Sequence, residues 1–64
     1  MMELKGNNIF RGRDRIGFVM GRDIHLSVVL SEADEDELIE LVNKELKINV
    51  RGCLKQGEFR LGAG

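Results

Sequence analysis

The apolar residues of this 64-residue chain change their spacing twice. Over residues 15–30 they alternate with polar residues in two runs around Gly21-Arg22-Asp23, which is typical of a β-hairpin. Over residues 38–46 they recur at helical spacing, and residues 47–55 alternate again, which predicts a strand there. These changes predict strands before and after a helix. We therefore expect an α+β fold in ββαββ order, with one antiparallel sheet and an amphipathic helix packed on one face.

The expected elements begin and end at recognisable signals. Ser31 begins the helix, because its side chain can accept a hydrogen bond from the backbone N–H of Asp34. Gln56-Gly57 is a turn, and residues 58–61 after it predict a last short strand. No linker is long enough to divide the chain. We expect a single domain over residues 1–64, with an N-terminal arm at 1–10 and a frayed tail at 62–64.

Size and composition exclude several classes of protein. The lone Cys53 rules out an internal disulfide, and with His25 it cannot supply a protein-only four-ligand zinc site. A chain this short has a marginal core, so we expect self-association, with a dimer favoured. The first residues, MMELKGNN, lack the apolar core of a signal peptide, so we expect none, and the longest apolar run is Val28-Val29-Leu30. We expect a cytoplasmic protein with no membrane contact and no cofactor.

Charge is sorted by segment rather than spread evenly. Residues 31–46 contain seven acids and one base, whereas residues 1–30 have a net charge of +2 and residues 47–64 a net charge of +3. The overall charge of −1 hides this polarity. Local fields, rather than total charge, decide what a protein attracts.

Strand alternation predicts which side chains share a face of the sheet. The face under the helix would hold the apolar set Ile16, Phe18, Met20, Ile24, Leu26, Val28, Leu30, Ile48, Val50, Leu54, Phe59 and Leu61. The opposite face would hold a set with six cations and no acid: Arg13, Arg15, Val19, His25, Ser27, Val29, Lys47, Asn49, Arg51, Cys53, Lys55 and Arg60.

Three interpretations of the second set compete. It is an ordinary solvated face, a phosphate-binding surface, or a surface for self-association built around Val19, Val29 and Cys53. The second interpretation predicts a small, non-enzymatic nucleic-acid-binding or regulatory protein. The cations expected to contact phosphates are Arg13, Arg15, Lys47, Arg51, Lys55 and Arg60, and three of them, Lys47, Arg51 and Lys55, would line one strand at steps of four.

The acidic helix supports an alternative function. Asp36, Glu37 and Glu40 would dock a basic protein partner, as in a binding module or inhibitor. The acids of residues 34–37 lack the spacing of a calcium loop, so we expect no metal site. His25 beside Cys53 is the one arrangement that suggests catalysis, and a surface histidine near a half-buried cysteine explains it equally well. We expect no catalytic residues.

Residues 24–61 resemble, in a generic way, the strand–helix–strand–strand half of LAGLIDADG homing endonucleases. The resemblance is carried by Leu26-Ser27-Val28, Asp36-Glu37-Leu38-Ile39, Gly52 and Phe59-Arg60-Leu61. That family lays a basic sheet on DNA and holds its metal-binding acids on a helix that bears the family motif. This chain lacks that helix. The resemblance therefore implies nucleic-acid binding through a sheet and does not imply cleavage.

Overall fold

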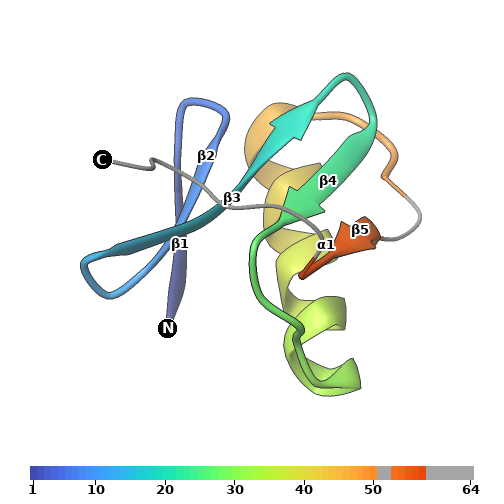
Figure 1. The fold of residues 1–64 in the computed structure, drawn as a ribbon. Coiled ribbons are helices and arrows are strands. Elements are labelled where there is room, and N and C mark those ends of the chain that lie inside the picture. Colours follow the sequence, from blue (N-terminus) through green and yellow to red (C-terminus); the bar gives the residue numbers. More distant parts are fainter. Residues whose placement is uncertain (51–52, 58–64) are drawn as a thin grey trace.

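The computed structural model describes residues 1–50 and 53–57, with residues 53–56 described through their backbone. It contains one five-stranded sheet and one helix (Figure 1). The elements are β1 (Met2–Lys5), β2 (Asn8–Arg11), β3 (Asp14–Met20), β4 (Asp23–Leu26), α1 (Glu32–Leu46) and β5 (Cys53–Gln56).

The architecture is the expected small α+β domain. Strands β1 to β4 follow one another as antiparallel neighbours, and α1 lies along one face of the twisted sheet (Figure 1). After the helix the chain returns to the sheet, where β5 pairs with β4 in parallel. The backbone N–H of Gly57 donates to the carbonyl oxygen of Leu26 at 2.8 Å and prolongs this pairing. The strand expected at 58–61 lies outside the described residues.

The N-terminal segment, expected as an arm over residues 1–10, is a hairpin of the sheet. β1 pairs with β2 in a register that sets Leu4 opposite Ile9. Met2 and Ile9 are buried in the core. The segment is held because Met2, Leu4 and Ile9, which alternate with outward-facing residues, reach the layer under α1.

Each antiparallel hairpin closes through a two-residue turn that begins with glycine. Gly6, Gly12 and Gly21 have φ of 61°, 63° and 62°, and each is followed by a residue with negative φ. Positive φ at the first central residue alone is the pattern of a type II′ turn, which favours glycine there. The same turn therefore repeats along the meander, and two of its copies are the Gly-Arg pairs at 12–13 and 21–22.

A β-bulge in β3 changes which side chains face the helix. Ile9 pairs with Gly17 and Phe10 pairs with Arg15, so Ile16 is an extra residue between them. An extra residue reverses the alternation beyond it. Ile16 is buried as expected, but Val19 is buried too, with 4% exposure.

The expected positions of three β3 side chains are corrected by this bulge. Phe18 and Met20 were expected under the helix and lie on the opposite face, whereas Val19 was expected on the opposite face and lies in the core. Period-two alternation counted along one strand cannot reveal the bulge, because the bulge is a property of the pairing with β2.

The helix begins where the sequence predicts. The Ser31 hydroxyl accepts from the backbone N–H of Asp34 at 3.3 Å, and acids fill the first turn, where the helix dipole favours them. Leu38 and Val42 are fully buried against the sheet. An exposed ion pair of 3.7 Å between Arg11 and Asp34 joins β2 to the start of α1.

The expected strand over residues 47–55 is corrected, because β5 begins only at Cys53. Lys47 ends α1 in the left-handed conformation, with φ of 54°. The Asn43 side chain then takes both backbone groups of Val50: its Nδ2 donates to the carbonyl oxygen at 3.1 Å, and its Oδ1 accepts from the N–H at 2.6 Å. Both backbone groups of Val50 are therefore paired with a helix side chain in place of a neighbouring strand.

The expected strand over residues 24–30 is also shorter, since β4 ends at Leu26. Ser27 remains attached to β3, because its backbone N–H and its hydroxyl both donate to the carbonyl oxygen of Ile16, at 2.8 and 3.1 Å. The chain then leaves the sheet, Val29 is 77% exposed, and Leu30 turns into the core just before α1.

The core lies between α1 and the inner face of the sheet. Its buried apolar residues are Met2, Ile9, Ile16, Val19, Ile24, Leu26, Leu30, Leu38, Val42 and Val50. Within the described part of the chain, no helix is long and apolar enough to cross a membrane.

Candidate nucleic-acid interface

The sheet has a second face, turned away from α1, whose side chains alternate with the core residues. We call this set of β1–β4 residues the outer face: Glu3, Lys5, Asn8, Phe10, Arg15, Phe18, Met20, Asp23 and His25. The antiparallel register arranges them in rows across the strands.

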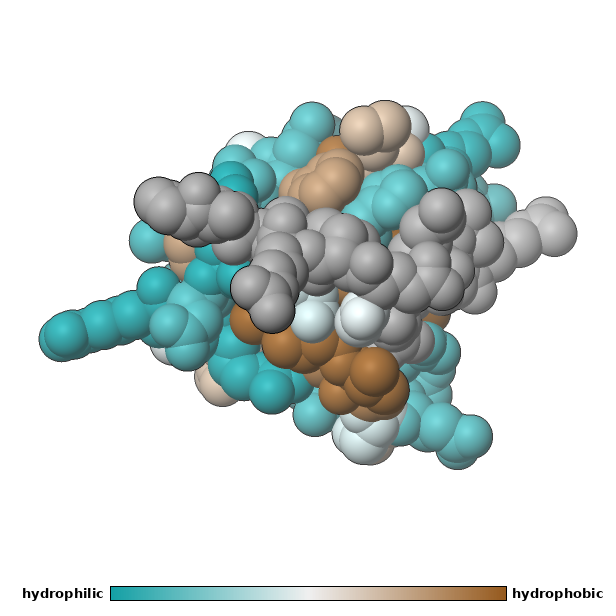
Figure 2. All heavy atoms as spheres, in the orientation of Figure 1, coloured by the Kyte–Doolittle hydropathy of each residue, from teal (hydrophilic) through white to brown (hydrophobic). Residues whose placement is uncertain are grey.

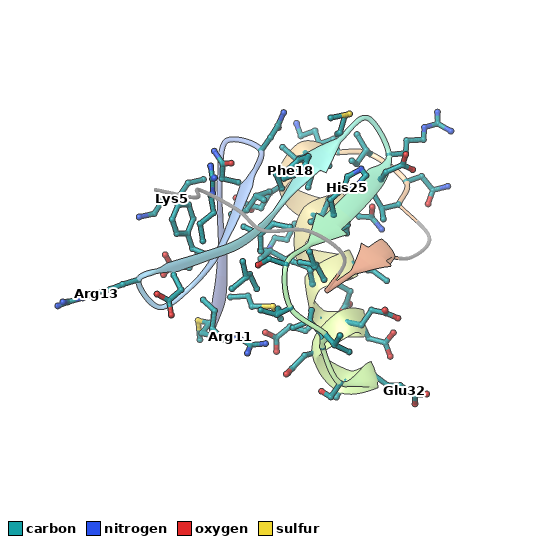
Figure 3. All side chains as sticks on the ribbon, in the orientation of Figure 1. Lys5, Arg11, Arg13, Phe18, His25 and Glu32 are labelled. Carbon is teal, nitrogen blue, oxygen red and sulfur yellow. The ribbon has the colours of Figure 1, made fainter. Side chains whose placement is uncertain are left out.

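The central feature of the outer face is a stacked pair of rings. Phe18 of β3 pairs directly with His25 of β4. Their ring centroids lie 5.0 Å apart with 14° between the ring planes, and the two side chains meet in Figure 3. Both residues are half-buried. The separation is within the range of favourable aromatic stacking.

A second aromatic contact lies on the first hairpin. The Lys5 ammonium is 5.2 Å from the centroid of the Phe10 ring, which is cation–π distance. Phe10 is opposite Arg15 in the β2–β3 pairing. Each ring on the first three strands therefore has a cation on its own strand or on the neighbouring one.

The rows place these groups in order across the sheet. One row of paired residues runs from Lys5 through Asn8 and Phe18 to His25, and the backbone of β5 continues it with Lys55. Neighbouring strands are about 4.8 Å apart, so the row is about 19 Å long. It has a lysine position at each end and the ring pair between them.

Gly17 allows the rings to stand side by side. A Cβ at Gly17 would collide with the His25 carbonyl oxygen and would lie 2.6 Å from Leu26 Cδ2. The missing side chain lets Leu26 fill the core at that point and brings the β4 backbone, with His25, close to β3. The stacked pair thus depends on a glycine that faces the other side of the sheet.

The electrostatics of the outer face differ from the expectation that it contains no acid. Lys5 and Arg15 share the face with Glu3 and Asp23, because β1 is part of the sheet and β4 begins at residue 23. Exposed arginines in the turns at either end of β3, Arg13 and Arg22, make the local balance positive. Most of the acids lie on the helix layer behind.

The sequence-predicted contact residues are only partly brought together. Arg13 in the β2–β3 turn and Arg15 in β3 are both exposed. Lys47 is exposed but ends the helix and lies on no strand, so the expected stripe of Lys47, Arg51 and Lys55 along one strand is wrong for Lys47. Lys55 is in β5 opposite His25. Arg51 and Arg60 lie outside the described residues.

The other expected sites are placed as follows. Asp36, Glu37 and Glu40 are exposed on α1. In residues 1–50 and 53–57, no three histidine, cysteine or acidic side chains gather to hold a metal ion. The backbone of Cys53 pairs with Ile24 and that of Lys55 with His25, so the register does not set Cys53 opposite the histidine.

Sequence reasoning missed Lys5, Phe10 and Phe18 as members of this surface. A signal for the first two was present, because Gly6-Asn7 separates two alternating four-residue runs, which is a hairpin pattern. For Phe18 there was none, since the bulge that turns it outward depends on pairing with β2.

No family model, curated protein or solved structure matches the chain.

Proposed function

We propose that this protein binds nucleic acid through the outer face of its sheet and acts as a small, non-enzymatic binding or regulatory protein. The observation that supports the proposal most is the combination, on one face, of cations and aromatic rings: Lys5 against Phe10, and Arg15 in the same row. Phosphates attract the cations and bases pack on the rings.

The layered distribution of charge supports the same surface. Acids crowd α1 on the far side of the sheet, at Glu32, Asp34 and Glu35 in the first turn and at Asp36, Glu37 and Glu40 beyond it. A polyanion is repelled by that side and attracted to the side with the exposed arginines. Binding is thereby oriented, with α1 pointing away from the phosphates. Figure 3 shows Arg13 at the tip of the β2–β3 turn and Glu32 at the far end of the helix.

The test measures how affinity for nucleic acid depends on salt. Each phosphate contact contributes about 0.7–0.9 to the slope of log affinity against log salt. We expect the double variant Arg13→Ala with Arg15→Ala to bind more weakly at about 50 mM salt and to lose about 1–2 from the slope, equally for all base sequences.

The matched control is Arg11→Ala with Lys44→Ala. It removes two exposed cations and reaches the same net charge, but Arg11 pairs with the helix residue Asp34 and Lys44 is on α1. We expect it to bind as the unmodified protein does. Equal losses in both double variants would mean that only net charge matters, and an absence of binding by the unmodified protein at low salt would end the proposal.

A second candidate is a module that docks a basic protein through α1. It is favoured by the exposure of Asp36, Glu37 and Glu40 along one helix. We expect the reversal Asp36→Lys with Glu40→Lys to abolish capture of a basic partner while leaving nucleic-acid binding intact or stronger. If the reversed protein retains the same partners from a cell lysate, the helix is not their docking site.

A further inference from the structure

We propose that Arg22 is a further phosphate-contact residue, and that a bound nucleic-acid backbone runs along β3 from Arg13 and Arg15 at one end to Arg22 at the other. This inference rests on the proposed function, and it gives the ligand a direction on the outer face and a minimum length. It is carried by the matching turns at the two ends of β3 and by the positions of the acids around that strand.

The two turns that flank β3 lie at opposite ends of the strand (Figure 1) and have the same construction. Glycine takes the positive φ of the first central position in each, at Gly12 and Gly21, and arginine follows it. The second central position of a type II′ turn has an ordinary negative φ, so the turn itself does not require arginine there. Arg13 and Arg22 are both exposed, and Figure 3 shows Arg13 extending away from the sheet. Each turn therefore presents a cation whose charge plays no part in closing the turn.

Both turn arginines are available to a ligand. Neither has an ion-pair partner among the described side chains, whereas Arg11, beside the first of these turns, contacts Asp34 of α1 at 3.7 Å. A guanidinium without such a partner can bind a phosphate through two parallel N–H···O bonds and gives up no ion pair in doing so. The structure thus separates the turn arginines, which are open to phosphate, from the arginine that joins β2 to the helix.

The length of β3 sets the distance between the two ends of the path. Arg13 lies one residue before the strand, and Gly21 and Arg22 form the turn directly after it. At about 3.3 Å per residue the two turns are about 25 Å apart. Phosphates are spaced by about 3.4 Å along each strand of a helical nucleic acid, so a strand of about eight nucleotides spans both ends. A trinucleotide covers less than half of that distance and reaches one end at a time.

Two acids near β3 lie off this path. Glu3 is on the edge strand β1, which is separated from β3 by β2. Asp14 is opposite Arg11, and Arg11 is opposite Met2 in the next pairing, so Asp14 shares the row of a buried core residue and belongs to the face under α1. Strand β3 itself has no acid over residues 15–20. A backbone that lies along the strand is therefore not repelled by it.

Asp23 is the acid that the path does approach. It is the first residue of β4, directly follows Arg22, pairs with Met20 and is half-buried. Its carboxylate lowers the positive potential at this end of β3, where one arginine acts, whereas two act at the other end. We therefore expect the end with Arg13 and Arg15 to bind the more tightly, and the Arg22 end to complete the contact on a ligand long enough to reach it.

The first experiment maps the path on the unmodified protein. Backbone amide chemical shifts are followed by NMR during titration with thymidine strands of about 3 and about 14 nucleotides at about 50 mM salt. With the longer strand we expect shifts in both turns, at residues 12–15 and 21–22, that fit one dissociation constant. With the trinucleotide we expect the two turns to titrate separately and at least about 10-fold more weakly, because no single molecule reaches both.

The second experiment removes the Arg22 charge. Arg22→Ala should lower the slope of log affinity against log salt by about 0.7 for the longer strand, which is one phosphate contact, and should leave the affinity for the trinucleotide within about 2-fold. Arg22→Lys keeps the cation and should retain the slope. Arg11→Ala is the matched control, because it removes one exposed cation that lies off the path, and its slope should be unchanged.

The third experiment removes acids. Asp23→Asn should tighten binding of the longer strand by about 2- to 5-fold, which is the range for one exposed charge interaction, because repulsion at the Arg22 end is relieved. Glu3→Gln changes the net charge equally at a position off the path and should tighten binding less. A larger effect at Glu3 than at Asp23, or shifts at residues 5–8 without shifts at 21–22, would indicate a backbone that crosses the strands and would overturn the inference.

The outcomes separate this inference from the proposed function. Binding that weakens in the double variant Arg13→Ala with Arg15→Ala but not in Arg22→Ala would overturn the path along β3 and leave a nucleic-acid-binding face with one phosphate-contact end. No binding of the unmodified protein to nucleic acid at low salt, whether single strand or duplex, would overturn both. The NMR map needs no variant, so it decides the path even where a substitution disturbs the fold.

Discussion

At the scale of the residue, the positions that shape the surface are not the charged ones that the sequence emphasises. Gly17 and Ile16 decide where the rings of Phe18 and His25 lie. The bulge at Ile16 turns Phe18 outward, and the missing side chain of Gly17 leaves room for Leu26 and brings His25 close to Phe18. Neither residue touches the proposed ligand. Both act on the backbone that holds the rings.

We predict that Gly17→Ala destabilises the fold by about 1–3 kcal/mol. The new Cβ would collide with the His25 carbonyl oxygen, which is backbone and cannot rotate away, and would press on Leu26. Urea unfolding followed by circular dichroism measures the loss.

Met20→Ala is the control for this substitution, because Met20 is on the same strand and is 62% exposed. Its free energy of unfolding should change by no more than about 0.5 kcal/mol. Equal stability of the Gly17→Ala and unmodified proteins would contradict the close approach of β3 and β4.

At the scale of the element, the segment after α1 is governed by the way the helix ends. Lys47 adopts a left-handed conformation that costs a residue with a Cβ about 1–2 kcal/mol. The strain is tolerated because it sends the chain back toward the sheet, where Ile48 packs against the core and Asn43 holds Val50. A side chain on the helix thus takes the place of a strand partner at Val50.

We predict that Lys47→Gly stabilises the protein by about 1 kcal/mol, because glycine adopts positive φ without strain. Lys44→Gly, three residues earlier and inside α1, should instead destabilise it by about 1 kcal/mol. Both variants lose one cation near the end of the helix, so the dipole contribution is similar in each. The difference in urea midpoint between the two variants is the measurement, and a loss of stability in both would argue against a left-handed Lys47.

At the scale of the whole molecule, stability is limited by size. Ten buried apolar side chains form the core of the described residues, and a chain of 64 residues hides only about 60% of the surface that its unfolded chain exposes, less than a larger domain does. Figure 2 shows an apolar patch over the connection between β4 and α1, where Val29 is 77% exposed. Edge strand β1 has charged residues at Glu3 and Lys5, which discourage strand-to-strand association there. The patch is therefore the better place for a second copy.

We predict a dimer in solution, with a mass by light scattering of twice the 7.2 kDa of one chain. Val29→Lys should shift it toward the monomer, because a charge in the patch must be desolvated when two copies meet. Met20→Lys introduces the same charge at an exposed apolar position of the outer face, away from the patch, and is the control for Val29→Lys. A mass of one chain over a hundredfold range of concentration would contradict the dimer.

The sequence by itself determined the fold class, the start of α1 at Ser31 and most of the core residues, because caps, turns and apolar periodicity act between residues close in the chain. Tertiary structure alone decided the face of Phe18, the coiled path of residues 47–50 and the separation of Lys47 from the sheet. Each of these depends on a partner distant in the chain or on a competing side-chain contact: β2 for the bulge, and Asn43 for Val50. Alternation is a local pattern, but the face that a residue occupies is set by the register between strands, and a single inserted residue reverses it.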